Sequence, residues 1–169
     1  MQGTYVTLRA SFTYNRGGQI VGVYMSELGC PPTSYMTNYT KFTGADTNHS
    51  RNVSAILRAV APNSHTYCAS WRALPSSDMI GVGANGSNPD IFFANFSCAY
   101  YDTITNINGI YNTISRDFDN FAYNSGVTII NAAGNIDSNN NYDEHVGFSG
   151  IGMNVLTVGN YNDYYNTPA

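Results

Sequence analysis

Charged residues are scarce in this chain. Only 11% of its 169 residues are Asp, Glu, Lys or Arg, and the net charge at neutral pH is −4. A protein that binds DNA or RNA neutralises phosphates with a basic surface, and seven Lys and Arg residues in an acidic chain do not supply one. The composition therefore argues against a nucleic-acid partner.

Long apolar runs and ligand motifs are also lacking. No stretch approaches the ~20 consecutive apolar residues that span a bilayer, so we expect no membrane partner. The three cysteines, Cys30, Cys68 and Cys98, contain no C-x-x-C pair and cannot all pair with one another; the simplest interpretation is three reduced thiols. No carboxylates have the spacing of a calcium loop, so no metal is expected, although the acidic run "DSNNNYDE" leaves weak cation binding open. No G-x-G-x-x-G follows the first predicted strand, so a dinucleotide site has little support and no cofactor is expected.

The polarity comes instead from neutral side chains. The chain has 22 Asn and 14 Tyr with many Ser and Thr, a composition often found in exported or surface proteins, although it does not fix the compartment. The length suits a single domain with its own core.

Strand-like and helix-like segments alternate along the sequence. Short apolar segments between turn residues predict strands at 19–24, 65–70, 90–97, 127–131 and 155–158. Apolar residues at helical spacing predict helices at about 49–61 and 104–125, with a brief one at 76–84. This alternation predicts an α/β fold of three layers, a mostly parallel sheet with helices on both faces, whose functional residues lie at the carboxyl ends of the strands.

Four segments carry a resemblance to a known family. "HSRNVSAILRAVAPNSHTY" (49–67) resembles the histidine motif of the subtilisin-like serine peptidases, in which H-G-T-H-V-A-x-I opens a helix. "GVTIINAAGN" (126–135) resembles the family's A-A-G-N motif. "DIFFANFSCA" (90–99) and "VGFSGIGMNVLTVGN" (146–160) are similar to its D-V-I-N-M-S-L-G and V-G-Y-P segments.

The resemblance implies a fold and a set of site residues. Residues 1–169 would form a single partial subtilisin-like domain, about the first two thirds of a seven-stranded fold, and a sheet cut short there would expose apolar surface. His49 would be the general base and Asn135 the oxyanion donor. A peptide or protein substrate would lie along Ser97, Cys98 and Ala99. Each has a plainer alternative: a helix-capping histidine, a turn asparagine and ordinary packing at a strand end.

The acid is the first departure from the family pattern. The family's Asp ends its first strand in V-A-V-I-D, whereas "VGVYMSELG" places Met25 at that position, and a thioether cannot orient an imidazole. Glu27, two residues later, and Asp46, three residues before His49, are the alternative carboxylates, and either is more often simply solvated. The histidine motif departs as well, because Ser50, Arg51 and Asn52 stand where the family has Gly, Thr and the second His.

The nucleophile is the second departure. The family's G-T-S-M-A-x-P motif does not occur in this sequence, and Ser149 aligns with a proline and lacks the spacing of a nucleophile elbow. Two hypotheses follow: a serine endopeptidase domain that needs a downstream serine-bearing segment as its partner and is inactive alone, or a non-catalytic scaffold that binds peptide or protein. A third is a flavodoxin-like α/β domain with an accidental likeness.

Overall fold

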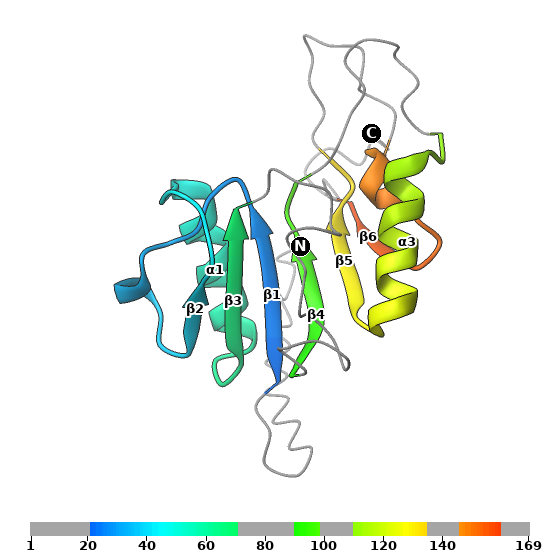
Figure 1. The fold of residues 1–169 in the computed structure, drawn as a ribbon. Coiled ribbons are helices and arrows are strands. Elements are labelled where there is room, and N and C mark those ends of the chain that lie inside the picture. Colours follow the sequence, from blue (N-terminus) through cyan, green and yellow to red (C-terminus); the bar gives the residue numbers. More distant parts are fainter. Residues whose placement is uncertain (1–20, 71–89, 99–109, 135–145, 160–169) are drawn as a thin grey trace, which may run out of the picture.

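The computed structural model describes residues 21–70, 90–98, 110–134 and 146–159 of the chain. They form one all-parallel sheet of six strands in the order β2-β3-β1-β4-β5-β6 (Figure 1). The α/β class and the parallel sheet predicted from the alternation are therefore confirmed. The elements are β1 Gly22–Glu27, η1 Thr33–Tyr35, β2 Tyr39–Lys41, α1 Asn48–Val60, β3 His65–Ser70, β4 Ile91–Phe96, α3 Thr113–Ser125, β5 Thr128–Ala132, η2 Phe148–Ile151 and β6 Val155–Val158.

The predicted boundaries need two corrections. The first strand does not end at Tyr24 but continues to Glu27, because Met25 and Ser26 pair with β3 and β4 although neither residue type favours a strand. The second long helix begins at Thr113, because Asn112 caps it. The predicted helix at 76–84 and the start of the second helix at 104–109 lie outside the described residues. Strand β2 and the two 3-10 helices were not predicted.

Helix α1 begins with a capping box. The Thr47 side chain accepts a hydrogen bond from the Ser50 backbone N–H, and the Ser50 hydroxyl lies 3.3 Å from the Thr47 backbone nitrogen. One turn further, Val53 and Leu57 pack against a buried group made of Met25, Cys30 and Cys68. The cap thus fixes where the helix starts, and the apolar stripe fixes which way it faces.

Helix α3 covers the other face of the sheet. Its Phe118 and Ala122 belong to the larger core cluster, together with Tyr24, Phe96 and Ile129 from three neighbouring strands. The helix ends at Gly126, whose φ of 68° is a left-handed conformation that glycine adopts without strain.

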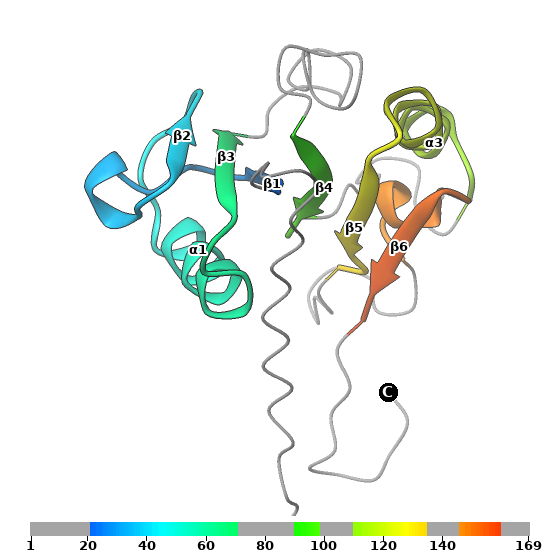
Figure 2. The same cartoon turned by 90° about the horizontal axis from the view of Figure 1, so that it is seen from below.

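The two helices lie on opposite faces of the sheet (Figure 2). Strands β2 and β3, joined through α1, and strands β4 and β5, joined through α3, are each one step apart in the same direction across the sheet. Because the helices lie on opposite faces, the two connections have opposite hands; the one through α3 is right-handed and the one through α1 is left-handed (Figures 1 and 2). About 98% of such connections are right-handed, so α1 occupies an uncommon position.

The α1 face of the sheet carries exposed apolar residues over β4 to β6. Across the ladder Met25 is followed by Asn95, Ile130 and Leu156, so these side chains share the α1 face. On this face Leu156 and Val158 of β6 are 59% and 53% exposed, and Phe93 of β4 is 41% exposed.

The expectation of three reduced thiols is wrong for two of them. Cys30 and Cys68 form a disulfide, and Cys98 is the free cysteine. Cys30 follows β1 and Cys68 lies on β3, the neighbour of β1, so the sheet brings together two residues that are 38 positions apart. Among the described residues no helix has the length and hydropathy needed to cross a membrane.

Candidate functional site

A carboxylate and an imidazole meet at the carboxyl end of β1. The Nδ1 atom of His49 lies 2.7 Å from Oε2 of Glu27. Glu27 is the last residue of β1, and His49 is the second residue of α1. Side chains alternate along a strand, so Glu27 points to the same face as Met25, which is the face that α1 covers. The left-handed connection thus brings the start of α1 to the carboxylate.

The environments of the two groups differ strongly. The Glu27 side chain is only 1% exposed, whereas that of His49 is 56% exposed. Burial raises the pKa of Glu27 above its usual value, and the hydrogen bond and charge of His49, with smaller contributions from Ser97 and the Leu28 backbone, oppose this rise. The second carboxylate oxygen, Oε1, is buried without a hydrogen-bond partner in the described part of the chain. His49 is therefore the main group that stabilises the ionised carboxylate.

The hydrogen bond fixes the use of each imidazole nitrogen. When Nδ1 donates its proton to Oε2, Nε2 is left as the basic nitrogen of a neutral ring. The exposed fraction of His49 places this side of the pair toward solvent. A buried carboxylate that orients an accessible imidazole and stabilises its protonated form is the arrangement used for general acid–base catalysis.

Of the two carboxylates that the sequence left open, Glu27 is the one that contacts His49. Met25, which stands where the resembling family has its Asp, is fully buried in the core beneath α1. Asp46 pairs with Arg51 on the surface instead of with His49. Glu27 was expected to be solvated, and that expectation is wrong. Its signal in the sequence was a carboxylate two residues after Met25, which lies on the same face of the strand once β1 is extended to Glu27.

Ser97 and Cys98 follow β4, the strand beside β1. Phe96 pairs with Ser26 in the ladder, so Ser97 lies level with Glu27, and its hydroxyl accepts a hydrogen bond from Asn95 Nδ2 at 2.8 Å. The Cys98 side chain packs against the core cluster on the α3 side, with its Sγ 3.9 Å from the Ser26 carbonyl oxygen, and burial raises the pKa of its thiol. Ala99, the third residue predicted to line a substrate groove, lies outside the described residues.

The asparagine motif is described only as far as Gly134. Strand β5 ends at Ala132, and Gly134 has a φ of 118°, a conformation that favours glycine. Asn135, the predicted oxyanion donor, is the next residue in the sequence and lies outside the described residues. Ser149, in η2, is fully buried, so its hydroxyl does not face solvent.

The described residues offer little to a metal ion. They contain no group of three or more His, Cys, Asp or Glu side chains that could hold one. What the site can do chemically is accept and return a proton at Nε2 of His49, with Glu27 behind it.

No family model, curated protein or solved structure matches this chain.

Proposed function

We propose that this chain is a portion of a subtilisin-like serine endopeptidase and carries the acid–base pair of the active site, Glu27 and His49. One observation supports the proposal above all: the 2.7 Å hydrogen bond between His49 and a buried carboxylate at the carboxyl edge of an all-parallel sheet. That edge is where open parallel sheets gather their catalytic residues.

The pair would act in peptide hydrolysis as follows. Nε2 of His49 takes the proton of a serine hydroxyl as the hydroxyl attacks the peptide carbonyl, and then gives that proton to the leaving amine. Glu27, ionised in the pair, holds the imidazole in the required tautomer and stabilises the imidazolium. A buried carboxylate suits this role because it is shielded from water and its charge is not screened.

The oxyanion donor would come from the end of β5. The side-chain amide of Asn135 would donate to the tetrahedral oxyanion, a contribution of about 3 to 4 kcal/mol at comparable sites. Support for this part is positional: β5 lies one strand from β4 and two from β1, and Gly134 ends the described segment at the same edge of the sheet as Glu27.

The nucleophile would be a serine on a segment that packs against the α1 face of β4 to β6. The exposed Leu156 and Val158 support this proposal, because apolar sheet faces are normally covered by another layer. A peptide substrate would then lie along the chain that follows β4, beside Ser97.

The test is covalent labelling with a fluorophosphonate, which reacts with activated serines. The chain is labelled alone and together with any downstream segment encoded with it. We expect labelling only in the presence of that segment, and its loss in His49→Ala. His65→Ala is the matched control, since His65 hydrogen-bonds Thr40 on β2, away from Glu27.

A second candidate function is a non-catalytic scaffold that binds peptide or protein. Met25 at the family's acid position, and Ser50, Arg51 and Asn52 in place of the conserved part of its histidine motif, favour it. A folded chain that is not labelled under either condition, as judged by circular dichroism of the same samples, would contradict the peptidase and support the scaffold.

A further inference from the structure

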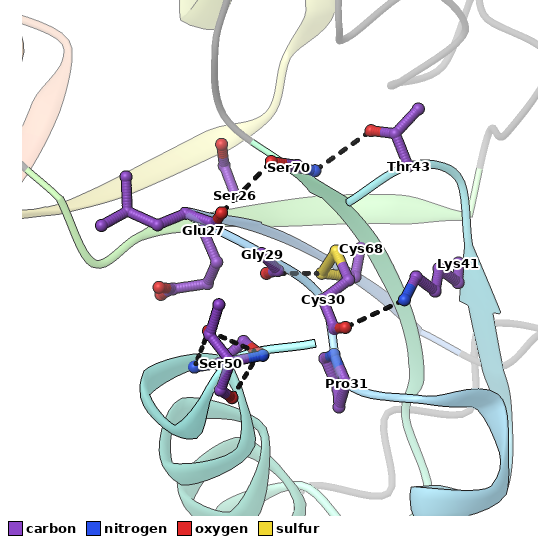
Figure 3. The surroundings of a disulfide bond; sticks show 12 residues. Ser26, Glu27, Gly29, Cys30, Pro31, Lys41, Thr43, Ser50, Cys68 and Ser70 are labelled. Carbon is purple, nitrogen blue, oxygen red and sulfur yellow. Dashed lines mark hydrogen bonds between the residues drawn. A yellow bond between two sulfur atoms is a disulfide. The ribbon is translucent and has the colours of Figure 1, made fainter. Parts of the chain in front are cut away.

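The Cys30–Cys68 disulfide lies beside Glu27, the carboxylate of the Glu27–His49 pair (Figure 3). Cys30 is three residues after Glu27, and Cys68 faces Met25 in the β1–β3 ladder. Both cysteines are fully buried. Figure 3 shows the Glu27 side chain directed from the end of β1 toward the first turn of α1, where Ser50 lies, with the disulfide beside it.

The three residues after Glu27, here called the 28–30 loop, contact the segment that leads into α1. The backbone N–H of Cys30 donates to the Ala45 carbonyl at 2.8 Å. A Cβ atom on Gly29 would lie 2.3 Å from the Ala45 oxygen and 2.7 Å from Cγ2 of Thr47, so only glycine fits at this approach. Thr47 is the N-cap of α1, two residues before His49. The 28–30 loop, which directly follows Glu27, is therefore in contact with the segment 45–47, which ends two residues before His49.

The disulfide and the side chains of Lys41 and Ser70 hold this loop in place. The Ser70 hydroxyl, at the end of β3, donates to the Leu28 carbonyl at 3.3 Å. The Cys68 sulfur lies 3.8 Å from the Gly29 carbonyl oxygen, and Nζ of Lys41 donates to the Cys30 carbonyl at 3.0 Å (Figure 3). The disulfide also closes a covalent ring from Cys30 to Cys68 that contains β2 and α1. His49 lies within this ring, and Glu27 lies just before it in the chain. The disulfide thus helps to fix the position of Glu27 relative to His49.

We propose that the Cys30–Cys68 disulfide is a positioning element for the Glu27–His49 pair, so that the pair forms fully only in the oxidised protein. The inference rests on the pair that the proposed function uses, but it concerns the contact and not the peptidase reaction. Reduction by a dithiol would transfer two electrons and two protons to the disulfide, giving two thiols and a cyclic disulfide of the reductant. The 28–30 loop would then be held to β3 less firmly, through the 3.3 Å hydrogen bond from the Ser70 hydroxyl to the Leu28 carbonyl, and the carboxylate would lose its fixed distance to the imidazole.

The test follows the Nδ1 proton of His49 by nuclear magnetic resonance in the full chain. The signal is assigned by its loss in His49→Ala, and its exchange with water is measured in oxidised protein, in protein treated with dithiothreitol, and in Cys30→Ala/Cys68→Ala. We expect exchange at least about tenfold faster without the disulfide, as for the loss of a charge-assisted hydrogen bond. Cys98→Ala is the control and should leave the exchange rate unchanged, and dithiothreitol should have no effect on the double variant.

A second variant covers the case in which the double variant does not fold. Lys41→Met keeps the disulfide and removes the hydrogen bond to the Cys30 carbonyl, and it should speed exchange at least about threefold. Arg58→Met is its match, because Arg58 donates to the Tyr35 carbonyl from the last turn of α1 and does not bond the 28–30 loop. Unchanged exchange at His49 in the folded, disulfide-free protein, or in Lys41→Met when the double variant is unfolded, would overturn the proposal. This readout needs no nucleophile, so failure of fluorophosphonate labelling would count against the proposed function alone.

Discussion

Met25 and Glu27 lie two residues apart on the same face of β1, and only Glu27 reaches His49. Met25 is packed beneath α1 with Cys30 and Cys68, while Glu27 stands at the last position of the strand, beside the first turn of the helix. In the family resemblance, Met25 stands at the position of the acid, and Glu27 lies two positions later. Because side chains of a strand alternate with a period of two, a carboxylate at Glu27 is still on the same face as one at Met25 would be. A glutamate side chain is also longer than an aspartate side chain, so its carboxylate extends further from the end of the strand.

Under the proposed function, removing the charge of Glu27 should abolish most of the activity of the chain combined with its serine-bearing segment. Glu27→Gln keeps the shape of the side chain but favours the wrong imidazole tautomer and does not stabilise the imidazolium. By analogy with Asp-to-Asn changes at catalytic triads, we expect turnover to fall by about 10⁴. The measurement is the rate of fluorophosphonate labelling or peptide hydrolysis by the chain with its serine-bearing segment.

Asp46→Asn is the matched control for this variant. It removes the charge of an exposed carboxylate near the start of α1, one that pairs with Arg51. Turnover should stay within about threefold of the unmodified chain, since exposed ion pairs contribute little. Equal losses in the two variants would show that Glu27 has no special role.

The stability of the fold should depend on pH through Glu27. Burial raises the pKa of this carboxyl above the unfolded-state value of 4.5, although His49 opposes the rise. The folded protein therefore binds the proton more tightly than the unfolded chain, so the stability that this group contributes is present below pH 4.5 and is lost as pH rises through the folded-state pKa. Relative to Glu27→Gln, the unmodified chain should lose free energy of unfolding as pH rises above that value.

Urea unfolding of both proteins at a series of pH values provides the measurement. The difference between the two proteins reports Glu27 together with its interaction with His49, because the remaining titrating groups are common to both. A difference that instead grows in favour of the unmodified chain with rising pH would mean that the interaction with His49 outweighs burial and lowers the pKa.

Reducing the Cys30–Cys68 bond should lower the global stability of the fold. The bond joins residues 38 positions apart, and closing a loop of that size restricts the unfolded chain. We expect a loss of about 2 to 4 kcal/mol in the free energy of unfolding. Urea unfolding with and without dithiothreitol measures it, with Cys98→Ala showing the same loss, and a change below about 0.5 kcal/mol would contradict the expectation.

Gly29→Ala should destabilise the protein through a clash with backbone. The added Cβ would lie 2.3 Å from the Ala45 carbonyl oxygen, so the loop or the segment before α1 has to move. We expect a cost of about 1 to 3 kcal/mol by thermal or urea unfolding. Gly159→Ala is the matched control, since nothing lies within 4 Å of its Cβ position, and it should be neutral within about 0.5 kcal/mol.

Periodicity was enough to predict most of the sheet and one helix. The helix that begins near His49 was located from apolar residues at helical spacing, and the strands His65–Ser70 and Val155–Val158 from short segments between turn residues, because strands in a parallel sheet read as short runs and amphipathic helices have a period of 3.6. Strand β2 was missed because Tyr39–Lys41 is three residues long and half-buried, which leaves no period to detect.

The candidate site was only partly predictable. His49 was singled out by its place at the start of a helix, but its partner depends on where β1 ends and on which face α1 covers. Met25 and Ser26 are part of β1 because β3 and β4 pair with them on both sides, a tertiary effect that local sequence does not carry. The pairing of Cys30 with Cys68 likewise follows from strand order, and three cysteines alone leave the connectivity open.

The hand of the β2–α1–β3 connection has a consequence for how the chain assembles. A connection of the common hand would carry His49 to the opposite side of the sheet, where the carboxylate of Glu27 does not point. Once α1 has packed on the sheet, a connection of one hand cannot change to the other unless α1 unpacks and crosses to the other face. We therefore expect the hand of this connection to be set early in folding, and a molecule with the other hand to lack the contact between Glu27 and His49.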